Sequence, residues 1–339
     1  MKAIGLYQYL PAEDENSLQD VDLTQPVPKD RDLLVEVNAI SVNPVDTKIR
    51  SPKEKIEEEP RILGWDAAGT VVAVGDRVEQ FKPGDDVYYA GDITRPGTNS
   101  EFHLVDERIV GHKPKTLSKS EAAALPLTSI TAWEALFDRL NISKTGKDAG
   151  KSILIIGGAG GVGSISIQMA KKVAKLNVIA TASRPETIDW CKQQGADIIV
   201  NHWHNLAEEI EKAGYKYVDY ILCLNSIDAH WQAIAQAIKP QGMICSIVEN
   251  QHPLEMNTLK SKSAGLVWEF MFTRSMYQTD DMNQQHQLLN EISNLMDIQV
   301  LHTTCNDVVR PINAQNLRSV HARIEKGSTI GKIVLADWS

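Results

Sequence analysis

The first 125 residues alternate apolar and polar positions over short segments, with dense turn residues between them. Period-two alternation is the pattern of half-buried strands. It predicts strands at 1–10 (MKAIGLYQYL), 32–42 (DLLVEVNAISV) and 69–74 (GTVVAV). Short strands at this spacing are typical of a small antiparallel barrel.

The pattern changes after Ser118, which has capping-box spacing to Glu121 and therefore predicts the start of a helix. From about residue 126, apolar runs of strand length alternate with helical segments, which favours a parallel, doubly wound sheet. The predicted strands are 152–156, 177–182, 218–223 and 243–248, and the predicted helices are 163–175, 185–194 and 230–238.

A polar helix at 279–296 is followed by short predicted strands at 299–303 and 332–335, which we expect to return to the first domain. The predicted organisation is therefore an α/β protein of two domains. A catalytic domain comprises residues 1–125 and 275–339, and a Rossmann domain comprises 126–274.

Composition and charge narrow the class of function. With 35 Lys and Arg against 44 Asp and Glu, the net charge is −9, which disfavours nucleic acid and anionic membranes as partners. Four widely spaced cysteines form no CxxC pair and fit a reducing cytoplasm. The uncharged stretch 152–170 contains five glycines, which favours a strand, a loop and a helix over a membrane span.

Residues 158–163 (GAGGVG) follow a predicted buried strand and open a predicted helix. In that context the G-x-G-x-x-G spacing predicts a dinucleotide site, because the glycines allow the backbone to approach a pyrophosphate at the helix N-terminus. An NAD site commonly has an acid about 20 residues further on. Here Ser183 and Arg184 occupy that place, and a hydroxyl with a guanidinium favours the 2′-phosphate of NADPH.

The sequence resembles the medium-chain dehydrogenase/reductase superfamily, and within it the quinone oxidoreductase branch. Its nearest likeness is to the bacterial group called zinc-type alcohol dehydrogenase-like proteins. The resemblance runs nearly end to end. It is carried by SVNPVD (41–46), LGWDAAG (63–69), VGDRV with FKPGDDVY (74–88), LTSITAWEAL (127–136), IIGGAGGVGS (155–164) and GKIVL (331–335).

The resemblance implies a GroES-like β-barrel catalytic domain in two chain segments, a Rossmann domain between them, a cleft at their junction and a homodimer. It implies that Asn43 lines the nicotinamide side and that Thr131 lies near the nicotinamide ribose. It also implies that Gly160, Gly161, Val162 and Gly163 form the pyrophosphate loop, with Ser183 and Arg184 at the 2′-phosphate. Quinone reductases often have an Asn-Tyr pair after the GAD turn; this chain has Asn201-His202, so His202 is a weaker candidate.

The residues depart from the family's zinc pattern. Zinc-dependent members have a Cys in the first loop and a His-Glu pair after a glycine, whereas this chain has Ser41-Val42-Asn43-Pro44 and Gly64-Trp65-Asp66. No cysteine precedes Cys191, so the four-cysteine loop is missing as well. Aspartates do not supply the N/S set that catalytic zinc prefers. We therefore expect no bound metal.

Without a Lewis acid, hydride donation to an already electrophilic acceptor is easier than alcohol oxidation. The sequence therefore predicts an NADPH-dependent oxidoreductase that reduces a small-molecule quinone or α,β-unsaturated carbonyl. Tyr88 or Tyr89 could donate a proton, and strand alternation predicts that only one of them points inward. The catalytic candidates are Asn43, Asp46, Trp65, Tyr88 and Tyr89, with Asn99 and Thr128 as further candidate cleft residues.

Two alternatives stay open at this point. One is a zinc-dependent alcohol dehydrogenase-like enzyme with atypical ligands, and the other is a non-catalytic NADPH-binding sensor. The aromatic and methionine residues at 268–276 are typical of a subunit interface or a flexible lid, and we favour the interface.

Overall fold

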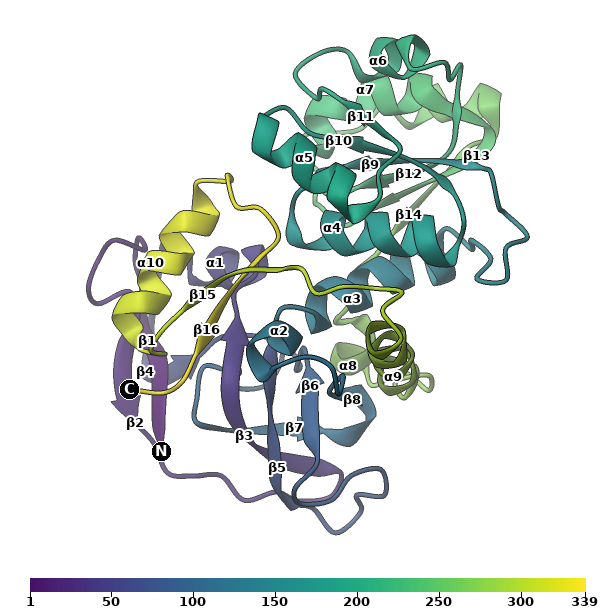
Figure 1. The fold of residues 1–339 in the computed structure, drawn as a ribbon. Coiled ribbons are helices and arrows are strands. Elements are labelled where there is room, and N and C mark those ends of the chain that lie inside the picture. The colour runs from purple at the N-terminus through teal and green to yellow at the C-terminus, as the bar shows by residue number, and fades with distance from the viewer. The chain divides into compact units, whose positions relative to one another are not determined.

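Residues 1–339 are described by a computed structural model in which both ends of the chain lie in the same unit (Figure 1). Unit 1 comprises Met1–Ile130 and Phe272–Ser339, and unit 2 comprises Thr131–Met271. The divisions fall a few residues from the predicted boundaries at 125 and 274. Because unit 2 is inserted into unit 1, segments from opposite ends of the sequence lie side by side.

Unit 1 is built on two sheets. The larger has the strand order β15-β16-β3-β5-β6-β8, with β7 also paired to β3, and the smaller has the order β2-β1-β4. The strands of the larger sheet are β3 (Asp32–Ser41), β5 (Ala67–Val74), β6 (Asp86–Tyr89), β7 (Phe102–Asp106), β8 (Val110–His112), β15 (Cys305–Val309) and β16 (Lys332–Ala336). Those of the smaller sheet are β1 (Lys2–Tyr9), β2 (Gln19–Asp22) and β4 (Lys53–Ile62).

The strands predicted at 1–10, 32–42, 69–74 and 332–335 are confirmed. β16 runs antiparallel to β3, with Val334 opposite Ser41, so the end of the chain does return to the N-terminal half. The strand predicted at 299–303 is wrong. The N–H groups of Val300 and Leu301 both donate to the carbonyl of Leu295 as a helix ends, and the strand begins only at Cys305.

The helices of this unit are short, apart from two near its C-terminal end. They are α1 (Pro44–Arg50), α2 (Lys119–Ala123), α8 (Thr273–Tyr277), α9 (Gln284–Asp297) and α10 (Ala314–Glu325), and α3 (Pro126–Trp133) leads into unit 2. The predicted capping box is confirmed, because Ser118 and Glu121 bond each other's backbone N–H groups. The predicted polar helix at 279–296 starts later, at Gln284.

Unit 2 has one six-stranded parallel sheet in the order β11-β10-β9-β12-β13-β14, as in doubly wound dinucleotide-binding folds. The strands are β9 (Ser152–Ile156), β10 (Asn177–Thr181), β11 (Ile198–Val200), β12 (Val218–Cys223), β13 (Ile238–Ser246) and β14 (Gly265–Trp268). The helices are α4 (Gly161–Gln168), α5 (Pro185–Gln194), α6 (Leu206–Lys212) and α7 (Ile227–Ala237). The predicted alternation of strands and helices is confirmed.

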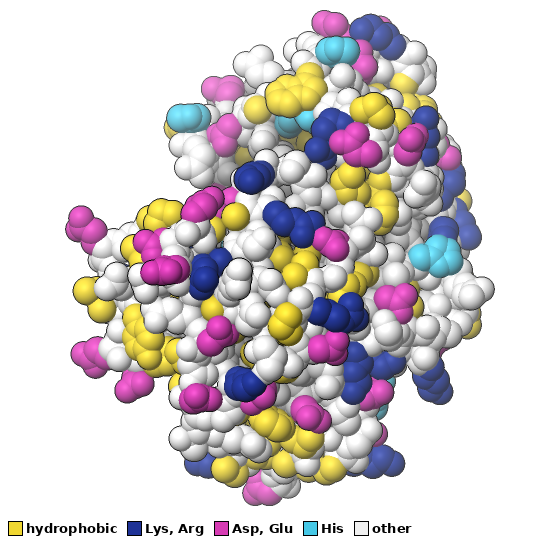
Figure 2. All heavy atoms as spheres, turned by 60° about the vertical axis from the view of Figure 1, so that its left-hand side comes forward, with side chains coloured by type: hydrophobic (Ala, Val, Ile, Leu, Met, Phe, Trp, Pro, Cys, Tyr) yellow, Lys and Arg dark blue, Asp and Glu magenta, His cyan; other side chains and the backbone are white.

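The surface carries both signs of charge. On the face drawn in Figure 2, Lys and Arg side chains are interspersed with Asp and Glu. None of the helices combines the length and the apolar character that crossing a bilayer requires.

Candidate functional site

The glycine loop lies at the carboxyl end of β9. This strand is near the middle of the unit 2 sheet and pairs with β10 and β12. Gly157 has φ +91°, a conformation that favours glycine. Its N–H donates to Thr181 Oγ1 at 2.9 Å, and the next N–H, from Gly158, donates to the Thr181 carbonyl. These bonds hold the loop against the end of β10, where the coenzyme-selecting residues are predicted.

Two glycines of the loop are under different constraints. A Cβ at Gly163 would lie 2.2 Å from the carbonyl oxygen of Gly157, so the fold itself requires glycine there. A Cβ at Gly160 would have only one neighbour within 4 Å, the same oxygen at 3.6 Å, which is an ordinary contact. Gly160 is the N-cap of α4 and has no side chain to cap it. The space beside Gly160 therefore fits a bound anion, which the first N–H groups of the helix would stabilise.

Ser183 and Arg184 follow β10 at the edge of this loop. Both are partly exposed, and Arg184 is the N-cap of α5. The Arg184 guanidinium Nε lies 3.3 Å from Glu186 Oε1. A carboxylate is thus present two residues after Arg184, although none occupies positions 183 or 184. The sequence reasoning did not weigh Glu186, which competes with a 2′-phosphate for the same guanidinium.

His202 lies in the turn after β11, the strand next to β10. Burial lowers the pKa of His202, so its imidazole is neutral at physiological pH and offers a phosphate one N–H donor and no charge. His204, the second imidazole of this segment, pairs with Glu209 at 3.4 Å. A contact of His202 with the coenzyme stays a prediction.

Two predicted threonines lie on α3. Thr128 is buried, and its hydroxyl donates to the backbone carbonyl of Leu125 at 3.1 Å. Thr131, predicted near the nicotinamide ribose, is also buried and begins unit 2.

In unit 1 the loop after β3 brings Asn43 against Asp66 and Lys332. Asn43 Nδ2 donates to Asp66 Oδ2 at 2.7 Å, and the Lys332 ammonium donates to Asn43 Oδ1 at 2.5 Å and to Asp66 Oδ2 at 3.2 Å. The Leu127 N–H donates to the other Asp66 oxygen at 2.8 Å. Burial raises the pKa of Asp66, against the opposing effects of Lys332 and these hydrogen bonds. The side chains of Asp66 and Lys332 are almost completely removed from solvent.

Asp46 lies in the first turn of α1 beside this group. Its Oδ2 accepts the backbone N–H of Asn43 at 2.5 Å, while its Oδ1 is buried without a hydrogen-bond partner. Burial raises the pKa of Asp46 to about 7, and the nearby Asp66 adds to the rise, whereas the Asn43 N–H and Lys332 oppose it. Asp46 can therefore hold a proton close to neutral pH, besides helping to cap α1 in a capping box with Asn43.

Tyr88 and Tyr89 are both completely buried, so the expectation that only one of them faces the cleft stays a prediction. The Tyr88 hydroxyl donates to the Leu289 carbonyl at 2.6 Å, and the Tyr89 hydroxyl lies 3.1 Å from His103 Nδ1. Consecutive side chains point to opposite faces of β6, and each face is covered by other parts of the unit. Burial raises the pKa of both phenols, so either would release its proton less readily than a free tyrosine.

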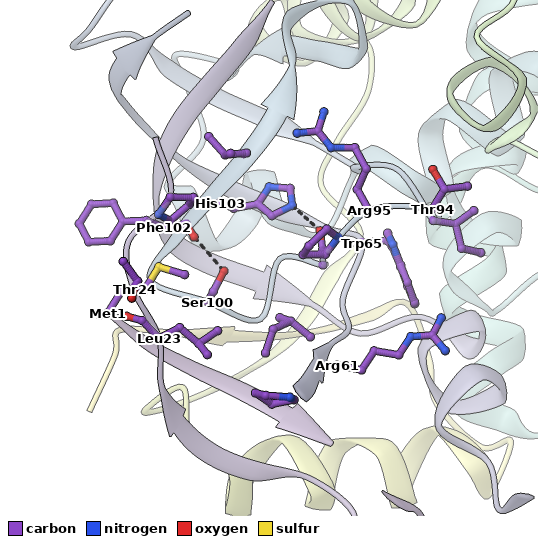
Figure 3. A pocket seen from close by; sticks show the side chains of 17 residues that line it. Met1, Leu23, Thr24, Arg61, Trp65, Thr94, Arg95, Ser100, Phe102 and His103 are labelled. Atoms are coloured by element: carbon purple, nitrogen blue, oxygen red, sulfur yellow. Dashed lines mark hydrogen bonds between the residues drawn. The ribbon is translucent and has the colours of Figure 1, made fainter. Parts of the chain in front are cut away.

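Trp65 lines a cavity of about 440 Å³ in unit 1 (Figure 3). Leu23 and Phe102 lie on one side of it, with Arg61 and Thr94 opposite. The Trp65 indole N–H donates to the Asp92 carbonyl at 3.3 Å, and its ring meets Phe272 edge-on at 6.1 Å. Among the catalytic candidates, Trp65 alone lines this cavity. Asn99 does not line this cavity, and its side chain lies beside Gly64.

These residues do not fit a catalytic zinc ion. At the positions where zinc-dependent relatives have ligands, Asn43 and Asp66 give their oxygens to the Lys332 ammonium, and Trp65 offers no lone pair. The donor set is oxygen only, and a cationic side chain already lies between the donors.

Lys332 is the residue that sequence reasoning missed. It was visible as the lysine of GKIVL, the closing motif, but nothing local in the sequence indicates that this lysine meets a loop some 290 residues earlier. Only the pairing of β16 with β3 brings the two together.

Comparisons with known proteins agree with this architecture. The family model "Alcohol dehydrogenase GroES-like domain" matches residues 29–115, and "Zinc-binding dehydrogenase" matches residues 161–291. A zinc-type alcohol dehydrogenase-like protein of Staphylococcus aureus (strain Mu50) is 43% identical over 336 residues, covering 99% of both chains. A crystal structure from Rhizobium etli CFN 42, provisionally assigned as a zinc-dependent alcohol dehydrogenase, has a TM-score of 0.96 at 49% identity and covers 100% of this chain and 98% of that one.

A third similarity covers part of the chain. The NADPH-dependent alkenal/one oxidoreductase of Arabidopsis thaliana chloroplasts is 35% identical over 206 residues, which are 58% of this chain and 50% of that protein. The chain belongs to the medium-chain dehydrogenase/reductase superfamily. It is an oxidoreductase of that type, with a GroES-like domain and a Rossmann-like parallel sheet, and within the superfamily it groups with the zinc-type alcohol dehydrogenase-like proteins of bacteria.

Proposed function

We propose that this protein is a zinc-independent, NADPH-dependent reductase of quinones or α,β-unsaturated carbonyl compounds. The observation that carries the proposal is the contrast within the glycine loop. The fold demands glycine at Gly163, but at Gly160 it leaves room in which a ligand could lie. A pyrophosphate at the α4 N-terminus fits that room and the exposed N–H groups around it.

The preference for NADPH rests on the residues after β10. Arg184 supplies a guanidinium and Ser183 a hydroxyl, and neither position carries the acid that would repel a 2′-phosphate. Glu186 holds the guanidinium in the absence of coenzyme and would have to yield it to the phosphate. The partial relative in Arabidopsis thaliana, whose name specifies NADPH, favours the same choice.

The class of acceptor is inferred from the poor fit of unit 1 to a zinc ion and from its possible proton donors. Its residues do not fit a zinc ion, so an acceptor that spreads incoming charge over its own conjugated system is the better substrate. The hydride would go to a quinone ring or to the β-carbon of an enone, and a proton would complete the reduced product. Tyr88 and Tyr89 are both engaged inside the unit, so solvent or Asp46 is the better proton source.

The test is coenzyme oxidation with NADPH and NADH, using a quinone and a small enone, in the presence and absence of a strong chelator. We expect turnover that is selective for NADPH and resistant to the chelator. Loss of activity on chelation, with recovery on adding zinc, would favour the zinc-dependent alternative. Saturable NADPH binding without turnover of either acceptor would favour a sensor.

We further propose that the protein is a homodimer in a reducing compartment. β14 is the outermost strand of the unit 2 sheet and pairs with β13 alone, so its free edge can pair with a second copy. Large apolar side chains accompany that edge, with Trp268 49% and Phe270 46% exposed. The four cysteines are all unpaired, as expected where thiols stay reduced.

A further inference from the structure

Lys332 is a buried lysine whose ammonium group has a complete set of acceptors. It donates to the Val42 carbonyl at 2.9 Å, to Asn43 Oδ1 at 2.5 Å and to Asp66 Oδ2 at 3.2 Å. An ammonium group has three N–H donors, and all three are directed to this one site. The side chain comes from β16, whereas its partners come from the loop after β3 and from the residue before β5.

This arrangement fixes the orientation of the Asn43 carboxamide. The carbonyl side of the amide faces a cation, and its NH₂ side faces the Asp66 carboxyl at 2.7 Å. A half-turn of the amide would place its NH₂ group against the ammonium and its oxygen against the carboxyl oxygen. Both new contacts would be repulsive, so charge alone selects one orientation.

Stability alone gives little reason to keep such a group. Buried charge pairs lose hydration on folding, and apolar side chains of similar volume often serve a core as well or better. Lys332 is 3% exposed in an otherwise apolar strand, where Ile333, Val334 and Leu335 are all buried. A methionine at position 332 would pack in that environment without any charge to compensate only if Asp66 were uncharged as well.

We propose that Lys332 is a positioning residue, an internal cation that holds the Asn43 carboxamide in one orientation at the place where zinc-dependent relatives hold a metal ion. The inference rests on the proposed function and on the expectation, implied by the family resemblance, that Asn43 lines the nicotinamide side. Lys332 itself need not touch coenzyme or acceptor, since it acts through Asn43 and Asp66.

The experiment is a double-mutant cycle between Lys332→Met and Asn43→Ala, with Lys332→Arg as the conservative variant. The exposed Lys326→Met is the matched control. For each protein, kcat and KM for the acceptor are measured beside the Kd for NADPH. We expect kcat to fall at least about tenfold in both single variants and no further in the double variant, because interacting groups are not additive. Lys332→Arg should recover part of the loss, and the Kd for NADPH, governed by unit 2, should change by less than about threefold.

Effects on kcat that multiply in the double variant would overturn the proposal, as would a Lys332→Met enzyme with normal kcat. If Lys332→Met fails to fold, Lys332→Met/Asp66→Asn removes both members of the buried pair and serves in its place. Its kcat should remain low if Lys332 positions Asn43, and normal kcat would overturn the proposal.

A wild-type protein without turnover would contradict the proposed function instead. The emission spectrum of bound NADPH then tests Lys332 separately. Positioning through Asn43 predicts the same spectral change in Lys332→Met and Asn43→Ala, and an unchanged spectrum in both would refute it.

Discussion

Asp46 should make the protein less stable as the pH rises, and Asp46→Asn should remove that dependence. An aspartate normally has a pKa of 3.8, whereas burial raises the pKa of Asp46 to about 7. Between these values the folded protein keeps a proton that the unfolded chain has released. Since the folded state binds more protons at Asp46 in this window, the contribution of Asp46 to stability is greatest below about pH 4 and falls until about pH 7.

The size of the effect follows from the same two values. Each pH unit across the window is worth about 1.4 kcal/mol, so the difference from 3.8 to about 7 corresponds to about 4 kcal/mol. The carboxamide introduced by Asp46→Asn would keep an oxygen for the Asn43 N–H that now bonds Asp46 Oδ2, so the cap of α1 need not be lost. Between pH 4 and pH 8, the free energy of unfolding of the variant should rise by about this amount relative to that of the wild type.

Other buried groups contribute to the wild-type curve with the opposite sign, so the difference between variant and wild type is the quantity to measure. Burial and the neighbouring Arg50 lower the pKa of His321 to about 3, and the stability tied to this histidine is lost as the pH falls. Urea unfolding followed by circular dichroism at several pH values gives both curves. The exposed Asp189→Asn is the control and should run parallel to the wild type.

Parallel curves for Asp46→Asn and the wild type would refute the reasoning, because Asp46 would then be charged in both states. If the wild type instead gained stability relative to the variant as the pH rises, the effect of Lys332 on the pKa of Asp46 would be larger than the effect of burial.

Five further substitutions test the coenzyme site and the subunit contact. Arg184→Ala should weaken NADPH at least about tenfold while changing NADH by less than about threefold, measured by calorimetry; equal losses would contradict the phosphate role. Glu186→Gln removes the carboxylate that competes for the Arg184 guanidinium and should tighten NADPH a few-fold, whereas weaker binding would show that Glu186 organises the pocket. Gly160→Val should abolish coenzyme binding with little change in melting temperature, and intact binding by this variant would disprove the loop assignment. Gly163→Ala should lower the melting temperature, because its Cβ would lie 2.2 Å from a backbone oxygen. Trp268→Asp should convert a dimer into a monomer in light scattering, and a dimer that persists would place the interface elsewhere.

Local patterns were enough for most of unit 2. β9, α5 and β12 match their predicted bounds because each is a regular segment with clear boundaries, such as the proline that opens α5. β4 (KEKIEEEPRI) was not predicted, since seven of its ten residues are charged and one is proline. It is a strand because it lies at the edge of a sheet and pairs only with β1, where polar side chains and proline are tolerated.

Within the site, the sequence indicated which residue types are present, but it did not indicate which residues they contact. Asn43 and Asp66 were recognised from motifs, but their shared partner Lys332 depends on the pairing of distant strands. Tyr88 and Tyr89 show the limit of period-two reasoning. Alternation tells which side chains share a face, but it does not tell that Leu289 of α9 and His103 of β7 cover both faces of β6.

The late position of β16 in the chain has a consequence for synthesis on the ribosome. β16 lies between β15 and β3, inside the larger sheet of unit 1, and it carries Lys332. Unit 2 is one continuous segment and can fold as soon as it has emerged. The N-terminal strands, by contrast, are synthesised before unit 2, and their partner strand β16 is synthesised only after it. During that time the Ala39–Ser41 end of β3, which pairs with β16 and not with β7, has an uncovered edge, and Asp66 has no counterion. The nascent chain should therefore depend on chaperones most in the interval before residue 332 leaves the tunnel.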